Sequence, residues 1–418
     1  EEAGGSGGTL VIGMTEEVEF SNVMYTQGGN SLMAAKLAQR GLLFLDENSN
    51  WIGELAVEVP SLENGGVSED GLTITYKLRE GLTFHDGSPV TSADVKATWE
   101  AIMSPDNTPI TRFGYDKIAS VDTPDDYTVV INYAEPFAAW TLLFDFVLPK
   151  HVIEENSPGL DESEAMRQPI GFGPFKFVEW KPGDYVAYEA FEDYWRGAPK
   201  VDRLVLQVYK SVEAELQAIK AGEIDVAWGL STSVIPQIRD MEPDGVNLVT
   251  VFSARYDVYT MNPGEPLFAD RNVRLAIHHA IDRDLLIEKL LFGEGKITNS
   301  PWANSPWENT NLESYEYDLD KSRQLLEEAG WKDEDGDGIR EAHGVEGVED
   351  GTPFSFLHLT WCGASQQADM QLFVQQMLKE VGIDMAVDCR RSAELFGTWS
   401  QNGVWSHGEF QMAGWVHG

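Results

Sequence analysis

The sequence has few basic residues. It contains 30 lysines and arginines against 69 aspartates and glutamates, so its formal net charge at pH 7 is −39. A surface of this sign repels the phosphates of nucleic acids and of anionic lipids. We therefore expect no nucleic-acid partner. We interpret the excess of acidic residues first as an adaptation for solubility, and a high-salt or hot habitat is the second interpretation.

The sequence also lacks a long apolar run, because no stretch approaches the ~20 apolar residues of a membrane-spanning helix. Its 418 residues, 42% of them hydrophobic, are enough for large cores and predict two or three domains. The first residues, EEAGGSGGT, are typical of a flexible tether. Such a tether fits an exported protein whose signal peptide has been removed, and a remnant of a cytosolic fusion is the alternative.

Motifs for catalysis are missing as well, since HExxH, GxxxxGK[ST] and GxSxG do not occur. The stretch GFGPF (171–175) lacks the third glycine of a dinucleotide loop. His278 and His279 are adjacent on a predicted helix, whereas a metal-binding pair needs a spacing of three or four. His85 and Asp86 lie in FHDGSPV, a pattern more typical of a turn held by its own hydrogen bonds. We therefore expect that the protein is not an enzyme.

Cysteine is scarce, with only Cys362 and Cys389. The sequence predicts a strand over 352–362, a helix over 365–382 and a second strand over 383–389. This is a βαβ unit, so the two strands should be parallel. If they are neighbours, both cysteines lie at the same end of the sheet. A disulfide between them is then plausible in an exported protein, and two buried free thiols are the alternative.

Capping residues mark several helices in the remaining chain. Thr91 precedes an apolar-periodic run and is followed by Asp94 three residues later, which is the pattern of a capping box. Gly222 is placed to end a helix, and Asp270 and Asp282 are placed to begin two more. Strands are predicted between the helices, including TLVIGM, LTITYKL, YTVVINY, GPFKFVEW, DYVAYEA and DRLVLQVY. The chain therefore belongs to the α/β class, with antiparallel hairpins in its first half.

The stretch WKDEDGDGIRE (331–341) begins like a calcium loop. Counted from its first aspartate, the EF-hand ligand positions fall on Asp333, Asp335, Asp337, the Ile339 carbonyl and Glu341. Position 12, which should be a bidentate glutamate, is Gly344. We therefore interpret the stretch as a structural turn. A solvated acidic turn is the first interpretation, and a site for one calcium ion, completed by Glu346, Glu349 or Asp350, is the second. We expect no required cofactor.

Several long segments resemble the extracellular solute-binding proteins of family 5, which are the peptide-, nickel- and oligosaccharide-binding receptors of ABC importers. The most specific is LREGLTFHDGSPVTSADVKATWEAI (78–102). Further segments follow in the order of the family, at 148–152, 171–206, 218–229, 266–295 and 317–341. The resemblance covers nearly the whole chain.

This resemblance implies a bilobed α/β fold of the periplasmic-binding-protein type II, with an extra inserted subdomain. The first lobe would combine residues 9–41 with 168–252, and the inserted subdomain would span 42–167. The second lobe would span 253–418. Because chains of this family normally run further, we expect the part that completes the first lobe to be absent from this one. The ligand would lie between lobes that close over it.

The resemblance also implies a function and a site. The protein would be an extracellular or periplasmic receptor, tethered by lipid, that captures a peptide or related small solute and delivers it to an ABC permease. We expect a monomer. Aromatic side chains would line the cleft, and the candidates are Phe20, Tyr25, Trp302, Trp399 and Trp415.

One departure from the family weakens the peptide interpretation. Peptide-binding members carry an aspartate three residues after the tryptophan that matches Trp415, and it pairs with the amino terminus of the peptide. Here Gly418 occupies that position, which would leave a desolvated amine without its partner. An oligosaccharide is therefore an alternative ligand. From other classes of protein, a hydrolase of extracellular polymers and a calcium-stabilised adhesion module remain as alternatives.

Overall fold

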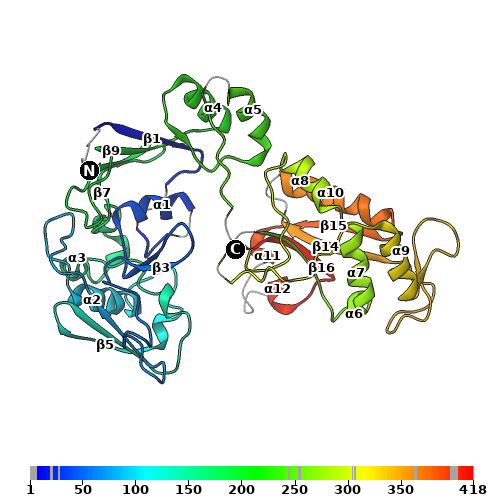
Figure 1. Ribbon diagram of the computed structural model, residues 1–418, viewed down its shortest axis with the longest axis horizontal. Coiled ribbons are helices and arrows are strands. Elements are labelled where there is room, and N and C mark those ends of the chain that lie inside the picture. Colours follow the sequence, from blue (N-terminus) through cyan, green and yellow to red (C-terminus); the bar gives the residue numbers. More distant parts are fainter. Residues whose placement is uncertain are drawn as a thin grey trace. The chain divides into compact units, whose positions relative to one another are not determined.

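The computed structural model describes residues 7–18, 22–26, 29–242, 245–252, 256–303, 305, 307–361, 365–395 and 403–417, without the side chains of 365, 366, 392, 393, 406 and 415–417. The chain divides into two compact units, Glu1–Leu230 and Ser231–Gly418 (Figure 1). Residues 231–252 fall in the second unit, whereas the sequence-based division placed them in the first lobe. The finer division into two lobes and an inserted subdomain stays a prediction.

A five-stranded sheet forms one layer of the first unit. Its order is β10 (Val226–Ala227), β1 (Thr9–Met14), β9 (Arg203–Val208), β8 (Tyr185–Ala190) and β7 (Phe175–Lys181). Strands β10, β1 and β9 are parallel to one another, and β8 and β7 continue the sheet antiparallel. The predicted strand TLVIGM is therefore confirmed, and it pairs with segments that lie about two hundred residues later in the chain.

The middle of the first unit forms smaller sheets. One is antiparallel, in the order β4 (Thr73–Lys77), β6 (Thr128–Tyr133) and β5 (Ile118–Asp125), and the other pairs β2 (Leu43–Leu45) with β3 (Trp51–Gly53). The helices of this unit are α1 (Gly29–Ala38), α2 (Ser92–Met103), α3 (Lys150–Asn156) and α4 (Val212–Ala221). The predicted caps are confirmed, because the Asp94 carboxylate accepts a hydrogen bond from the Thr91 N–H at 2.8 Å, and Gly222 ends α4 with φ 72°.

The stretch GFGPF packs against the end of α1. A Cβ atom at Gly171 would overlap the carbonyl oxygen of Ala38, and one at Gly173 would lie 2.6 Å from the carbonyl oxygen of Leu37. Only glycine allows the backbone to approach a helix end this closely. The main-chain N–H of His85 in turn donates to the Gly171 carbonyl at 2.8 Å.

A four-stranded sheet forms the centre of the second unit. Its order is β11 (Tyr256–Met261), β16 (Met412–His417), β14 (Ser355–Trp361) and β15 (Asp384–Arg390), and a separate hairpin pairs β12 (Trp331–Lys332) with β13 (Glu341–Ala342). Strands β14 and β15 are parallel neighbours joined by α10 (Ser365–Lys379), so the predicted βαβ unit is confirmed.

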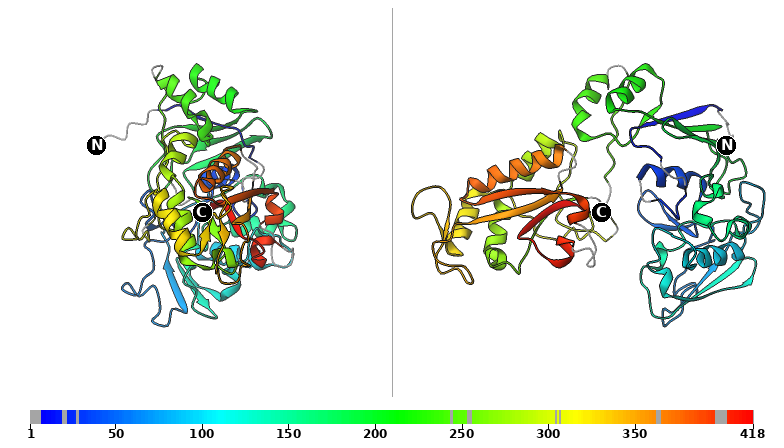
Figure 2. Two further views of the ribbon diagram at one scale, coloured as in Figure 1. Left: turned by 90° about the vertical axis from the view of Figure 1, so that its right-hand side faces the viewer. Right: turned by 180° about the vertical axis from the view of Figure 1, so that it is seen from behind.

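Helices cover both faces of this sheet. The others are α5 (Ile235–Met241), α6 (Pro266–Ala269), α7 (Arg271–Ala280), α8 (Arg283–Leu290), α9 (Leu319–Glu328), α11 (Ser392–Leu395) and α12 (Val404–His407). Phe356 of β14 belongs to the core formed with α7, α9 and α10, whereas Leu359 packs with α11 and α12 on the other face (Figure 2). Asp270 and Asp282 accept main-chain hydrogen bonds at the starts of α7 and α8, as predicted.

Candidate functional site

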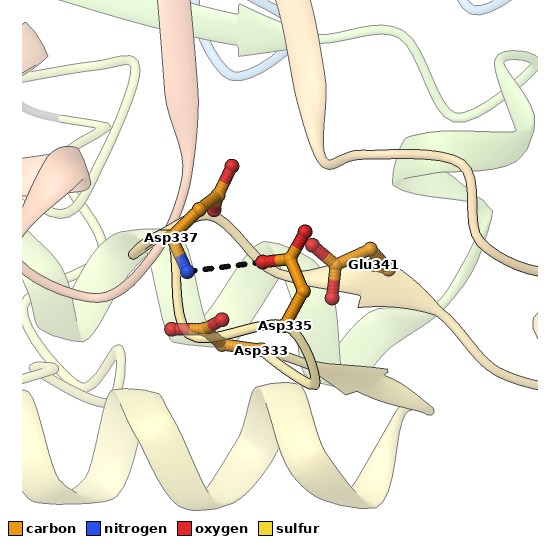
Figure 3. A group of neighbouring side chains, drawn as sticks. All are labelled: Asp333, Asp335, Asp337 and Glu341. Carbon is orange, nitrogen blue, oxygen red and sulfur yellow. Dashed lines mark hydrogen bonds between the residues drawn. The ribbon is translucent and has the colours of Figure 1, made fainter.

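The acidic loop between β12 and β13 brings four carboxylates together. Oxygen atoms of Asp333, Asp335, Asp337 and Glu341 all lie within 4.8 Å of one another (Figure 3). Main-chain N–H groups of the loop donate to these carboxylates, among them Gly336 to Asp333 at 2.8 Å and Asp337 to Asp335 at 3.0 Å. The cluster is therefore formed by the local fold of the turn, and its oxygen ligands are of the kind that calcium prefers.

Two further residues qualify the calcium prediction. The N–H of Ile339 donates to the Asp337 carboxylate at 2.7 Å. The role of the Ile339 carbonyl as a calcium ligand stays a prediction. Asp350 lies outside the cluster, and its carboxylate accepts a hydrogen bond from the Gly344 N–H at 2.7 Å. Within the part of the chain that the structure describes, four carboxylates are the whole of this candidate ligand set.

The predicted aromatic residues of the cleft are only partly described. Phe20 and Trp399 lie outside the described residues, and Trp415 lies in β16 without a described side chain. Tyr25 is half-buried in the first unit, and its hydroxyl donates to the Asn107 side-chain oxygen at 2.6 Å. Trp302 belongs to the second unit. Their role in ligand binding stays a prediction.

Trp302 has a neighbour of the same type. Its side chain is 59% exposed, and that of Trp307 is 63% exposed. The two rings meet edge to face, with centroids 6.5 Å apart. Exposed aromatic faces of this kind bind organic ligands and also occur without one.

The second unit contains a cavity of about 430 Å³ that the sequence did not predict. This volume falls in the range of small-molecule sites, about 300–1,000 Å³. Most of its wall is apolar and comes from β11, α7, α8 and the segment after α8, with Met261, Ile277, Ile281, Leu286, Ile287 and Leu291 among the lining residues. Asp257, Glu294 and Lys296 also line it, and Glu294 accepts a hydrogen bond from Arg239 at 2.7 Å.

The histidines take structural positions. The ring Nε2 of His85 lies 3.0 Å from the Gly173 carbonyl, and burial lowers the pKa of His85 to about 4. His151 lies 2.9 Å from the Asp86 carboxylate on a partly exposed surface. His279 Nδ1 lies 2.7 Å from the carbonyl of Glu316. These contacts fit the interpretation of His85 and His279 as packing residues.

Only one of the two cysteines is among the described residues. Cys389 at the end of β15 is disulfide-bonded. Its predicted partner Cys362 lies outside the described residues, so the pairing stays a prediction. Thr360 of β14 lies opposite Cys389 in the register of the sheet. The end of β14, just before Cys362, is therefore beside Cys389.

Comparisons with known proteins identify the family. The model of the "Bacterial extracellular solute-binding proteins, family 5 Middle" matches residues 52–418. This chain belongs to the family 5 solute-binding proteins. The resemblance inferred from the motifs is thereby confirmed.

The relatives of this family 5 protein include peptide-binding proteins. The oligopeptide-binding protein AppA of Bacillus subtilis is 31% identical over 388 residues, which are 91% of this chain and 68% of AppA. A Brucella ovis protein named as an ABC transporter peptide-binding protein is 32% identical over 348 residues. This match covers 82% of the chain and 61% of that protein, so the chain spans less than two thirds of this relative.

Solved structures agree with the family. AppA of B. subtilis in complex with a nonapeptide has a TM-score of 0.65 and 29% identity, covering 98% of this chain and 79% of AppA. NikZ of Campylobacter jejuni in complex with Ni(L-His) has a TM-score of 0.71 and 26% identity, covering 98% and 77%. The predicted class, a bilobed α/β binding-protein fold, is confirmed. No helix within the described ranges is both long and apolar enough to cross a membrane.

Proposed function

We propose that this family 5 protein is the extracellular substrate-binding component of an ABC importer and captures a peptide or related small organic solute. The observation that carries the proposal is its likeness to AppA, which was solved with a bound nonapeptide and matches 98% of this chain at 29% identity. The family consists of binding proteins, so we further propose that the solute is bound and released without chemical change. The partner would be a membrane permease.

The mode of attachment and the oligomeric state belong to the same proposal. The Gly/Ser-rich start of the chain suits a tether to a lipid anchor outside the cell. Because each ligand would be enclosed by one chain, a monomer is sufficient for binding. Binding by closure requires only that the solute contact the closed state better than the open state.

The peptide proposal is tested by a thermal-unfolding screen of the full-length protein. The ligands are di- to nonapeptides, the same peptides with acetylated amino termini, and α- and β-linked oligosaccharides. A ligand that binds only the native state at about 100 times its Kd stabilises it by about 2.7 kcal/mol. We expect stabilisation by peptides. Free amino acids serve as the control for non-specific solute effects.

The acetylated peptides address the position of Gly418. If no carboxylate pairs with the peptide amine, acetylated and free peptides should stabilise the protein equally. A strong preference for free peptides would mean that another acidic group neutralises the amine. Stabilisation by oligosaccharides alone would replace the peptide proposal with the sugar alternative, and breakdown of any bound compound, followed by chromatography, would contradict binding without turnover.

A further inference from the structure

The carboxyl ends of three parallel strands lie together at one edge of the first unit. In the register of the sheet, Gly13 of β1 lies opposite Ala227 of β10, and Met14 lies opposite Val208 of β9. Each of these residues lies at or next to the end of its strand. The segments that follow the three strands therefore leave the sheet side by side.

Helices α1 and α4 cover opposite faces of the sheet at this edge. Met14 packs in one cluster with Ala34 and Ala38 of α1. Gly13, its neighbour in the strand, faces Glu215 of α4. Because successive residues of a strand point to opposite faces, the helices that follow β1 and β9 lie on opposite faces of the sheet at this point (Figure 1). In open α/β sheets, ligands bind outside the carboxyl ends of the strands at such a point.

Trp228 is the first residue after β10 at this edge. Its side chain is 49% exposed, although a tryptophan is among the most costly side chains to leave in water. Its main-chain N–H is held by two acceptors, the Gly13 carbonyl at 2.9 Å and the Glu215 Oε1 atom at 3.1 Å. The backbone at Trp228 is therefore fixed while its ring remains open to solvent.

Glu215 is an unusual anchor for this backbone. It lies in the first turn of α4 and has no exposed surface. Its Oε2 atom has no hydrogen-bond partner among the described residues, and burial raises the pKa of this carboxyl. Burying a carboxyl with an unpartnered oxygen costs stability, and an apolar residue would avoid that cost.

Gly13 makes the room for this arrangement. A Cβ atom at Gly13 would lie 2.6 Å from Ile224 and 3.2 Å from the Cγ atom of Glu215. A side chain there would push Glu215 away from the Trp228 N–H. Gly13 and Glu215, which are far apart in the sequence, therefore hold one exposed indole at the edge where the sheet geometry favours a ligand.

We propose that Trp228 forms an aromatic wall for an apolar or aromatic side chain of the bound peptide, and that Glu215 and Gly13 are its positioning residues. This inference rests on the proposed function, since it names the part of a peptide that this surface recognises. The face of an indole gains most from apolar groups that it removes from water.

Binding by two sets of peptides tests the wall. One set carries leucine or phenylalanine, and the other consists of glycine and serine at equal length. In Trp228→Ala we expect the Kd of the apolar set to rise about tenfold or more, which is the loss typical of a buried aromatic anchor. The Kd of the Gly/Ser set should change little, and Trp228→Phe should restore most of the affinity. Phe113→Ala is the matched control, because Phe113 is a 70% exposed aromatic residue of the same unit.

The results separate this inference from the proposed function. If the wild-type protein binds apolar peptides and Trp228→Ala binds them equally well, the wall is overturned and the peptide-binding function stands. If the wild-type protein binds no peptide, both are overturned. An equal loss in Trp228→Ala and Phe113→Ala would also contradict the wall, because it would reflect a general effect of removing surface aromatics.

A second pair of variants tests the positioning role of Glu215. Glu215→Gln keeps an oxygen that can accept the Trp228 N–H, whereas Glu215→Met has similar length and no such oxygen. We expect Gln to preserve the preference for apolar peptides and Met to reduce it. In a Trp228→Ala background, Met should cause no further loss of this preference. A purely structural role would instead weaken both peptide sets equally, and that result would overturn the positioning role.

Discussion

Single residues set how closely the backbone segments of the first unit approach each other. Gly171 and Gly173 lie against the end of α1, and His85 joins them through the main-chain bond to Gly171 and the ring contact to Gly173. The signature segment around His85 and the glycine pair are therefore parts of one packing arrangement. Both segments lie in the parts of the sequence that resemble the family. The structure explains their residue types, because only glycine fits against the end of α1 and His85 bonds to both glycines.

Substitution of Gly171 should be severely destabilising. We expect Gly171→Ala to lower the free energy of unfolding by about 3 kcal/mol or more, because its Cβ atom meets a helix-end carbonyl that cannot move freely. Gly29→Ala is the matched control, since a Cβ atom there meets nothing within 4 Å. Urea unfolding of the two variants measures the difference, and equal stability would contradict the close approach.

His358 should make the protein sensitive to acid. It has no exposed surface, its ring lies tilted against that of Tyr259 with centroids 5.1 Å apart, and burial lowers its pKa to about 4. The unfolded chain takes up this proton near pH 6.5, whereas the folded protein resists it until about pH 4. The contribution of neutral His358 is therefore complete above pH 6.5 and is lost as the pH falls toward 4.

The variant His358→Leu isolates this effect. Between pH 7 and pH 5 the wild-type protein should lose about 2 kcal/mol more of its unfolding free energy than the variant loses. Urea unfolding at the two pH values measures both losses. Equal losses would mean that His358 does not resist protonation in the folded protein.

At the scale of elements, the β12–β13 hairpin shows how an exposed acidic loop is anchored to a core. Trp331 of β12 is fully buried, and its ring stacks on Phe354 with centroids 4.2 Å apart. The guanidinium of Arg340 donates to the Trp331 carbonyl at 2.8 Å and to the Val381 carbonyl at 2.8 Å. Both ends of the loop are thereby fixed, while its carboxylates remain largely exposed.

Calcium should stabilise the second unit if the loop binds it. We expect the unfolding temperature to rise on adding calcium and to return on adding a chelator, because the ion would offset the repulsion among four carboxylates. Asp335→Asn should reduce the rise, while Glu380→Gln, an exposed carboxylate outside the loop, should retain it. No rise in the wild-type protein would favour the solvated acidic turn.

At the scale of the whole molecule, charge is the dominant feature. The chain carries a net charge of −39, so its acidic side chains repel one another when the chain is compact, and this repulsion opposes folding. Ion pairs with lysine or arginine can neutralise only a minority of 69 acidic residues, because the chain has 30 basic ones. Water and dissolved cations must therefore screen the charge of most of the acidic residues.

Salt should raise the stability of this protein. We expect the unfolding temperature to increase between 0.05 and 1 M sodium chloride, since screening shortens the range of the repulsion from about 14 Å to 3 Å. The increase should shrink at pH 5, closer to the isoelectric point of about 4.4, where fewer carboxylates are charged. A decrease with salt at pH 7 would mean that attractive ion pairs outweigh the repulsion.

Local features were determined by the sequence itself. The caps at Thr91, Asp270 and Asp282, the βαβ unit and the acidic loop depend on residues close together in the chain, and the structure contains each of them. Their physical basis is local, because a cap or a turn forms between residues a few positions apart. The family motifs, which are also continuous segments, were recognisable for the same reason.

Features that join distant segments were decided only by the tertiary structure. The anchor of Trp228 needs Gly13 from the start of the chain and Glu215 from a helix, and the cavity of the second unit has walls from β11, α7 and α8. No spacing in the sequence reveals these contacts, because sheet order and helix packing determine which distant side chains meet. The sequence determined the class, the family and the local turns, and the packing of strands and helices decided which distant side chains meet.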